Sequence, residues 1–427
     1  MGDDLRSVRV NPERCRGRMS CMRACPTEAI RIRQGRAVIL EDRCIDCGEC
    51  VRACPNSAIQ PLTGSFTDFA RFKYTIALPS PAIYGQFRRD ILPGTILRAL
   101  TRIGFDEACD LTWATEAVSV AIDEFLADYR GPLPLISPFC PAVVRLVQAR
   151  FPALVDQLVP IDSPMEIAAR EIKNRKAREL GLPMDEIGVI YLTPCPAKIV
   201  AVEYPPRKRA SYLDGAIAIS DIYQPLLAAV SREAEQPADA EAVKGLGLGW
   251  PVLGGQAACL RTEDTLAVGG LRDVACILED VENGKLGELQ YLECHACPQG
   301  CCSGPLTVEN PYFARSKILH LVDRYGRQPG CSREEIQRLY RLGYFSLPGR
   351  FSPQPFPPLD AEISRAIEKR ARMKEILETL PHIDCGACGA PTCHSFAEDV
   401  VQGRAVIEDC VVLAAEHARR NRHTALA

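Results

Sequence analysis

Blocks of apolar and polar residues succeed one another through the middle of the chain and predict alternating strands and helices. The apolar run 132–137 predicts a buried strand, and residues 142–151, introduced by Pro141, predict a helix. The segment 187–198, "IGVIYLTPCPAK", repeats this plan with a strand followed at once by Cys195. In α/β sheets ligands gather beyond the carboxyl ends of strands, so these ends are candidate sites.

Three other stretches have their own patterns. The glycine-rich residues 245–255 lack a G-x-G-x-x-G register, so we predict a strand and a close-packed turn rather than a nucleotide site. Residues 346–360 are rich in proline and predict a stiff linker. After them, apolar residues recur at helical spacing and predict an amphipathic helix, with Ile363, Ile367, Met373, Ile376 and Leu380 on its apolar face.

Composition narrows the class of protein. The 427 residues suffice for two or three domains, and the net charge of −3 gives no reason to expect a nucleic-acid partner. No run of about 18 uncharged apolar residues predicts a membrane span. The first residues lack the apolar core of a secretory signal, so we expect a cytoplasmic protein. In that setting the 21 cysteines predict metal ligation rather than disulfides.

The first cysteine group contains the run C-x2-C-x2-C-x3-C-P, formed by Cys44, Cys47, Cys50, Cys54 and Pro55. In such a run three thiolates bind one iron–sulfur cube, and the fourth reaches the neighbouring cluster. Residues 5–62 resemble a bacterial two-cluster ferredoxin, with matching half-repeat ends "RACPTEAI" and "RACPNSAI".

The first half-repeat departs from this pattern, because Arg18 stands where the second ligand belongs. By the crossed ligation of the resemblance, Cys25 would join the three cysteines 44, 47 and 50 around a [4Fe–4S] cluster. Cys15, Cys21 and Cys54 would remain for a [3Fe–4S] cluster, or for a cube whose fourth iron binds water or another side chain. The alternative is that this second cluster is absent.

A further group lies near the C-terminus, where Cys385, Cys388, Cys393 and Cys410 have the spacing C-x2-C-x4-C-x16-C. This stretch resembles the small [4Fe–4S] domain of corrinoid iron–sulfur proteins. A zinc site is the alternative. We interpret His394 as a neighbour in the loop rather than a ligand.

Four cysteines of the central region form one candidate site from three distant segments. "SPFCP", "TPCPAK" and "ECHACPQGC" contain Cys140, Cys195, Cys297 and Cys301. These segments resemble the three active-site motifs of [FeFe]-hydrogenases, T-S-C-C-P, M-P-C-x-x-K and E-x-M-A-C-x-G-G-C, over residues 65–345. The resemblance implies that the four cysteines hold a [4Fe–4S] cube. It further implies that Cys301 bridges to a two-iron unit carrying CO and cyanide, and that Lys198 hydrogen-bonds to a cyanide.

The chain also departs from these motifs. The family's proton-relaying cysteine is replaced by Phe139, which cannot carry a proton. Thr193, Ala201 and His295 replace a methionine, a glutamate and a methionine of the family. We interpret His295 as a polar residue that fixes its loop, with a substitute proton relay as the alternative. The spare Cys294 and Cys302 are expected to be packed thiols.

Together these features predict a two-lobed hydrogenase-like α/β domain flanked by small ferredoxin-like (α+β) and helical [4Fe–4S] domains. We predict the ferredoxin-like domain at 1–62, the hydrogenase-like domain at 63–345, a proline-rich linker and helix at 346–375, and the last cluster domain at 376–427.

Three functions follow, and the first is favoured: a hydrogen-sensing or slow hydrogenase, resembling sensory members of the family that have altered motifs and an extra C-terminal cluster domain. The alternatives are a catalytic hydrogenase linked to ferredoxin, and an electron-transfer protein without the two-iron unit. Ferredoxin or a signalling protein is the expected redox partner, and maturation enzymes would be needed for the two-iron unit.

Overall fold

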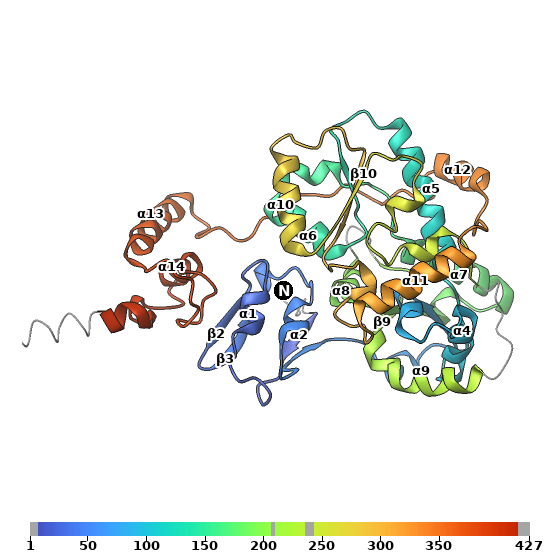
Figure 1. Cartoon of the computed structure of the whole chain (residues 1–427), viewed down its shortest axis with the longest axis horizontal. Helices are drawn as coiled ribbons and strands as arrows, with labels where there is room; N and C mark the ends of the chain where they lie inside the picture. Colours follow the sequence, from blue (N-terminus) through green and yellow to red (C-terminus); the bar gives the residue numbers. More distant parts are fainter. Residues whose placement is uncertain (1–6, 206–209, 235–242, 417–427) are drawn as a thin grey trace, which may run out of the picture. The chain divides into compact units, whose positions relative to one another are not determined.

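The computed structural model describes residues 7–205, 210–234 and 243–416. The chain divides into two compact units, which are considered separately. The first contains residues Leu62–Gln354. The second joins Val8–Pro61 to the part of the chain that begins at Pro355. Figure 1 labels many elements of both units, where there is room.

The first unit contains two parallel sheets, which confirms the predicted α/β class. One sheet has the strand order β6-β5-β8-β9 and the other β10-β11-β7. The strands are β5 (Tyr74–Pro79), β6 (Glu107–Ala108), β7 (Leu135–Ile136), β8 (Ile187–Thr193), β9 (Gly215–Ala218), β10 (Thr265–Gly269) and β11 (Tyr291–His295). The helices are α3 (Phe66–Phe69), α4 (Pro93–Arg102), α5 (Thr112–Asp128), α6 (Pro141–Arg150), α7 (Pro164–Leu180), α8 (Pro196–Glu203), α9 (Ile219–Glu233), α10 (Leu271–Glu282), α11 (Pro311–Tyr325) and α12 (Arg333–Arg341).

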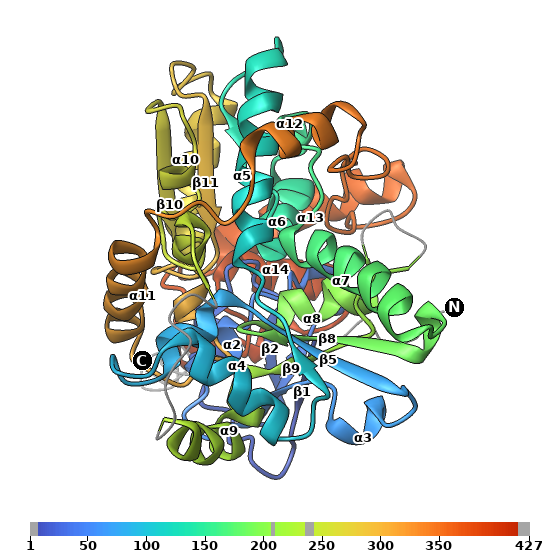
Figure 2. The same cartoon turned by 90° about the vertical axis from the view of Figure 1, so that its right-hand side faces the viewer.

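Strand β8 explains why its sequence is apolar without interruption. All seven of its residues are buried, because the sheet is covered on both faces. Val189 and Tyr191 belong to one core cluster with α5 and α7, whereas Ile190 and Leu192 belong to a second cluster with α4 and α9. Figure 2 shows α4 and α9 on one side of these strands and α7 and α8 on the other. Strand β8 therefore contributes one face to each of the two hydrophobic cores.

The second unit contains two antiparallel strand pairs and short helices. Strand β1 (Val8–Val10) pairs with β4 (Ile59–Pro61), and β2 (Ile30–Arg33) pairs with β3 (Arg36–Ile39). Its helices are α1 (Ser20–Ala24), α2 (Glu49–Ala53), α13 (Ile363–Thr379) and α14 (Cys393–Val401). The N-terminal part has the α+β composition expected of a ferredoxin-like domain, and the C-terminal part is helical.

The structure tests two local predictions, one for residues 245–255 and one for the helix that begins at Ile363. A strand within 245–255 is wrong, because residues Leu246–Gly249 form a 3₁₀ turn. The close packing is present: a Cβ added to Gly247 would lie 2.2 Å from the Thr112 carbonyl oxygen, so the backbone touches α5 directly. The helix predicted from Ile363 forms, but Ile363 and Ile367 are exposed, whereas the later apolar residues Met373, Ile376, Leu377 and Leu380 pack in a core.

Within the described residues, no helix is both long enough and apolar enough to cross a membrane.

Candidate iron–sulfur sites

Cys140 and Cys195 occupy equivalent positions in the two sheets of the first unit. Cys140 follows β7 as the N-cap of α6, and Cys195 follows β8 as the N-cap of α8. In both cases proline occupies the first helical turn and holds the cysteine before it in extended conformation. Each thiol therefore lies at a strand's carboxyl end and at a helix N-terminus, where a thiolate is stabilised.

Cys297 and Cys301 lie in the loop that follows β11, the neighbour of β7. Gly300 has a φ of +77°, and a Cβ there would lie 2.6 Å from the carbonyl oxygen of Pro251. Only glycine fits this position, since it combines a left-handed backbone with close approach to a second chain segment. The turn places Cys301 at the start of a 3₁₀ turn and leaves Cys297 buried.

The structure brings these motifs together at the carboxyl ends of strands from both sheets. Burial raises the pKa of Cys195, Lys198 opposes this shift, and the nearby thiols of Cys301 and Cys140 add to it, so that the pKa is about 12. The amide of Ala296, next to Cys297, donates to the Cys140 sulfur at 3.4 Å. Three separated segments thus converge on one site.

Lys198 lies against this cysteine group, with its Nζ 3.8 Å from the Cys301 sulfur. Burial would lower its pKa, but Cys301 and the neighbouring Tyr191 phenol and Cys195 thiol hold it well above the ordinary value. The ammonium also lies 5.9 Å from the centre of the Tyr191 ring. Sequence analysis missed Tyr191, although a phenol in an otherwise aliphatic strand was a signal.

His295 links Cys301 to a buried carboxylate. Its Nε2 lies 2.8 Å from Oε1 of Glu293, and both side chains are almost completely buried. Burial would lower the pKa of His295, but its hydrogen bonds to Cys301 and Glu293 raise it to about 10. Burial would likewise raise the pKa of Cys301, but Lys198 and His295 lower it to about 6. These contacts place His295 between Cys301 and Glu293; its role in fixing the loop stays a prediction, as does the alternative of a substitute proton relay.

The carboxylate of Glu293 accepts hydrogen bonds from the glycine-rich segment that follows α9 and from Ala257 just beyond it. Its two carboxylate oxygens accept the amides of Gly254 and Ala257 at 2.9 and 2.8 Å. Gln256, between these two residues, lies 3.5 Å from His295 and accepts a hydrogen bond from Ser137 at 2.7 Å. The segment is a polar support for the cysteine loop. Sequence analysis singled out neither Glu293 nor Gln256.

Phe139 adds no titratable group to the site. Its ring packs against Trp250, with ring centroids 5.1 Å apart, and its side chain is buried. Trp250 in turn donates its indole N–H to Ser119 at 2.9 Å. Thr193, the last residue of β8, stabilises the turn that leads to Cys195, because its hydroxyl donates to the Cys195 carbonyl at 3.0 Å. Ala201 is buried in α8.

Crossed ligation predicts two groups among the ferredoxin-like cysteines, and cysteines of different half-repeats lie near one another. Burial raises the pKa of Cys50, and the thiols of Cys25 and Cys21 in the other half-repeat also raise it, so that the pKa is about 12. Burial also raises the pKa of Cys21 to about 11, with Cys54 and then Cys15 adding to the shift. Cys44 and Cys47 complete the first group, since both interact with Cys25 and Cys50.

The altered half-repeat keeps the backbone of the intact one. Met19 adopts a φ of 60° before α1, where the second half-repeat has Gly48 with a φ of 76° before α2. Arg18 is exposed at the position equivalent to Cys47. The loop has therefore lost one thiol without losing its conformation.

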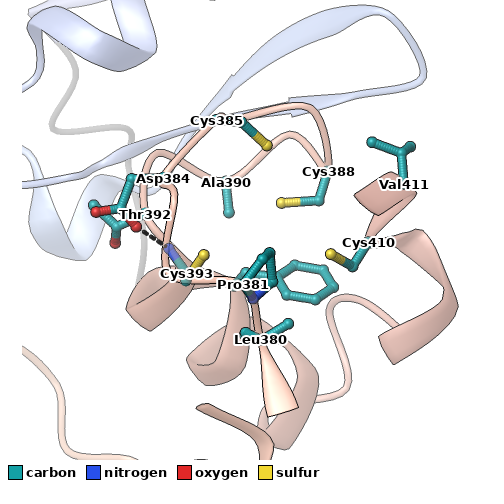
Figure 3. A pocket seen from close by; sticks show the side chains of 12 residues that line it. Leu380, Pro381, Asp384, Cys385, Cys388, Ala390, Thr392, Cys393, Cys410 and Val411 are labelled. Atoms are coloured by element: carbon teal, nitrogen blue, oxygen red, sulfur yellow. Dashed lines mark hydrogen bonds between the residues drawn. The ribbon is translucent and has the colours of Figure 1, made fainter. Parts of the chain in front are cut away.

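The C-terminal cysteines line a partly open pocket. Figure 3 shows the sulfurs of Cys385, Cys388, Cys393 and Cys410 facing this space. Asp384 accepts the amide of Cys393 at 2.6 Å and so closes the loop onto the start of α14. His394 is exposed.

These donor sets suit iron–sulfur clusters. Each comprises thiols from more than one segment, and burial raises several of their pKa values, which is costly for a bare thiolate and is offset when the thiolate binds iron. Of the spare cysteines, Cys294 and Cys302 are buried, and the Cys302 thiol donates to the Gln299 carbonyl at 3.0 Å. Among the residues described here, no group of three or more His, Cys, Asp or Glu side chains forms a site for a single metal ion.

Comparison with protein families covers all three regions. Residues 73–229 match the iron-only hydrogenase large subunit, C-terminal domain. Residues 7–55 match a 4Fe–4S dicluster domain, and residues 380–412 match an Fe–S cluster family, which favours a cluster over zinc there.

Curated relatives point the same way. The chain is 28% identical over 142 residues to the NADP-reducing hydrogenase subunit HndD of Solidesulfovibrio fructosivorans, covering 30% of this chain and 24% of that one. It is 24% identical over 124 residues to iron hydrogenase 1 of Clostridium pasteurianum, covering 28% and 22%. The matched part thus spans about a quarter of these relatives.

One solved structure with a TM-score of 0.50 supports the fold. A [FeFe]-hydrogenase structure that concerns oxygen inactivation of the enzyme aligns with a TM-score of 0.50 at 16% identity, covering 68% of this chain and 98% of that one. A variant of [FeFe]-hydrogenase HydA1 from Chlamydomonas reinhardtii aligns at 0.47 and 14%, covering 68% and 98%.

The fold and the cysteine groups together define an iron–sulfur protein with a hydrogenase-type α/β domain. The family matches then describe its parts: residues 73–229 are similar to the C-terminal domain of iron-only hydrogenase large subunits, so this region of the chain is [FeFe]-hydrogenase-like.

Proposed function

We propose that this protein is a hydrogen-responsive [FeFe]-hydrogenase-like protein, working as a sensor or a slow catalyst of H2 ⇌ 2 H⁺ + 2 e⁻. The observation that carries the proposal is the convergence of Cys140, Cys195 and Cys301 with Lys198 at the carboxyl ends of strands from two sheets. In this proposal the four central cysteines, including Cys297, hold a [4Fe–4S] cube. Cys301 then also binds a two-iron unit, which would supply the hydrogen chemistry.

The residues of the chain have defined tasks in this proposal. Lys198 presents a cation at the bridging thiolate, where it can hydrogen-bond to an anionic ligand. Glu293 orients His295, and His295 hydrogen-bonds to Cys301. The buried ring of Phe139 packs on Trp250 and offers no proton acceptor, which supports slow turnover.

Accessory clusters would carry the electrons. We assign a [4Fe–4S] cluster to Cys25, Cys44, Cys47 and Cys50, and another to the four C-terminal cysteines. A [3Fe–4S] cluster is assigned to Cys15, Cys21 and Cys54, where Arg18 leaves three thiols. The expected setting is the cytoplasm, with ferredoxin or a signalling protein as redox partner.

Infrared spectroscopy of protein made anaerobically with the maturation machinery tests this proposal. Bands of iron-bound CO and cyanide that shift under hydrogen support it, and a turnover assay then separates sensor from catalyst. Protein with a full complement of clusters but without such bands would contradict both hydrogenase functions and leave an electron carrier.

A further inference from the structure

The C-terminal cluster loop packs directly on the ferredoxin-like part of the same unit. The amide of Ile32 in β2 donates to the carbonyl of Gly389 at 2.8 Å, as in an added strand. Arg33 donates to the carbonyl of Cys388 at 3.3 Å, and Arg23 of α1 donates to that of Cys385 at 3.0 Å. The backbone carbonyls of two candidate ligands are thus bound by the ferredoxin-like part.

Buried ion pairs hold this contact. Asp399 of α14 is fully buried, and its Oδ2 lies 2.5 Å from Nε of the buried Arg31 and 2.6 Å from Nη2 of Arg33. Glu398 pairs with Arg43 beside it. The face of the ferredoxin-like part is basic and that of the C-terminal part is acidic, so the two surfaces are complementary in charge.

Two glycines of the C-terminal motif, Gly386 and Gly389, allow the same contact because they have no side chain and adopt a positive φ. Gly389 has a φ of +81°, and a Cβ there would lie 2.0 Å from the Ile32 carbonyl oxygen. Gly386 has a φ of +76°, and its Cβ would lie 2.9 Å from the Met22 methyl carbon. These glycines let the loop turn around its site, and they also let it approach β2 and α1 closely.

The contact leads to one particular ferredoxin-like site. Met22 follows Cys21 directly in α1. Ile32 is paired with Ala37 across the β2–β3 hairpin, and the Ala37 amide donates to the Cys15 sulfur at 3.3 Å. One pair of cross-strand neighbours therefore connects the C-terminal cysteine loop with the site of Cys15, Cys21 and Cys54.

We propose that the C-terminal cluster is docked on the ferredoxin-like domain as its direct electron-transfer partner, with the Arg18-altered site as the point of contact. The transfer moves one electron between a reduced and an oxidised iron–sulfur cluster, with no bond made or broken and no proton moved. The altered site then joins the C-terminal cluster to the remaining [4Fe–4S] site. This inference rests on the iron–sulfur assignments but needs neither hydrogen nor a two-iron unit.

Electron paramagnetic resonance on the anaerobically reconstituted full chain tests the docking. We expect the signal of the cluster at Cys15, Cys21 and Cys54 to relax faster when the C-terminal cluster is paramagnetic, and Cys388→Ser to remove this effect. Asp399→Asn should weaken it at least twofold, whereas Glu408→Gln, which removes an exposed charge from the same domain, should not. Equal relaxation in the parent and Cys388→Ser proteins, with iron analysis confirming the C-terminal cluster in the parent, would overturn the proposal.

Hydrogen exchange tests the docking contact in the unmodified chain itself, and then in the two variants. We expect the Ile32 amide of the unmodified chain to be protected, and its exchange to accelerate at least tenfold in Asp399→Asn but not in Glu408→Gln. An Ile32 amide that exchanges as fast as an exposed peptide in the unmodified chain would refute the docking. Because neither measurement uses hydrogen, a failure here is distinct from a failure of the hydrogenase proposal.

Discussion

Lys198 reaches Cys301 across 103 residues of sequence, with its Nζ 3.8 Å from the cysteine sulfur. Lys198 lies in helix α8, which follows strand β8 of one sheet. Cys301 lies in the turn after strand β11, which belongs to the other sheet of the first unit. A cation beside a thiol favours the thiolate, which is the form that binds iron. The pair therefore links the geometry of the site to its ability to hold a cofactor.

The first prediction concerns the thiolate of Cys301 in cluster-free protein. Because Lys198 and His295 lower its pKa to about 6, Cys301 should be mostly thiolate at neutral pH, whereas Cys302, with a pKa of about 12, should not. Iodoacetamide should modify Cys301 with a midpoint near pH 6, measured by peptide mass spectrometry. Lys198→Met should move the midpoint toward the ordinary value near 8.5 and slow the reaction at pH 7 by at most about 30-fold, since His295 still lowers the pKa.

Lys285→Met is the control for that experiment, since Lys285 is an exposed lysine paired with Asp280. It should leave the midpoint unchanged. An unchanged midpoint in Lys198→Met as well would mean that the ammonium does not act on the thiol.

The second prediction concerns Glu293, which orients His295 and holds the glycine-rich segment. Glu293→Gln removes the charge that faces His295 and leaves one oxygen to accept two amides, so the support of the cysteine loop weakens. We expect about 10- to 100-fold weaker retention of the central cluster against a chelator, which is the usual cost of losing an outer-shell partner. Iron release followed by absorbance measures this. Clusters of the second unit should be unaffected, and so should all clusters in the exposed-site variant Glu263→Gln.

Features set by residues that are close together in the sequence could be predicted, whereas contacts between distant segments could not. The apolar run of β8, the proline-started helices and the ligand spacings are local, and each predicted its element or cysteine group. The contact of Glu293 with the amides of Gly254 and Ala257 depends on how a loop lies against a strand, and no local pattern encodes that. Arg31 and Asp399 are 368 residues apart, and their pairing follows only from packing of the two parts.

The third prediction concerns the altered ferredoxin-like site. Arg18 is exposed in a loop whose backbone matches that of Cys47, as the positive φ values of Met19 and Gly48 show. Arg18→Cys should therefore supply a fourth thiolate without refolding the loop. We expect a [4Fe–4S] signal to replace that of a [3Fe–4S] cluster, with one more iron bound per chain. Resonance spectra and iron analysis measure this, and Arg18→Ser, which adds no thiol, should keep the parent signal.

The fourth prediction concerns the pH dependence of stability through Lys317. Its buried ammonium donates to the carbonyls of Arg88 and Ile91, and burial lowers its pKa to about 8. Between pH 8 and the ordinary value near 10.4, the unfolded chain holds a proton that the folded chain has released, so stability rises with pH. The contribution to the unfolding free energy is about 3 kcal/mol over this range.

Chemical denaturation at several pH values measures this contribution as a difference between variants. Lys317→Met should lack the rise, whereas the exposed-site control Lys285→Met should keep it. Parallel pH profiles for the parent and Lys317→Met proteins would show that the amine keeps its proton throughout.

The last prediction concerns Phe139, which stands where the resembled family has a proton-relaying cysteine. Phe139→Cys places a titratable thiol beside Cys140, and a positioned proton-transfer group contributes about 10²- to 10⁴-fold to catalysis. In protein with the two-iron unit inserted, hydrogen turnover should increase toward that range, provided that the site is slow for lack of a relay. The substitution also removes a buried ring that packs on Trp250, so stability should fall by about 3–5 kcal/mol.

Phe139→Ala creates a similar cavity without a thiol and is the matched control. Faster turnover in Phe139→Cys but not in Phe139→Ala would identify proton transfer as the step that the ring blocks. Equal turnover in both would instead place the limit in electron transfer or in the two-iron unit.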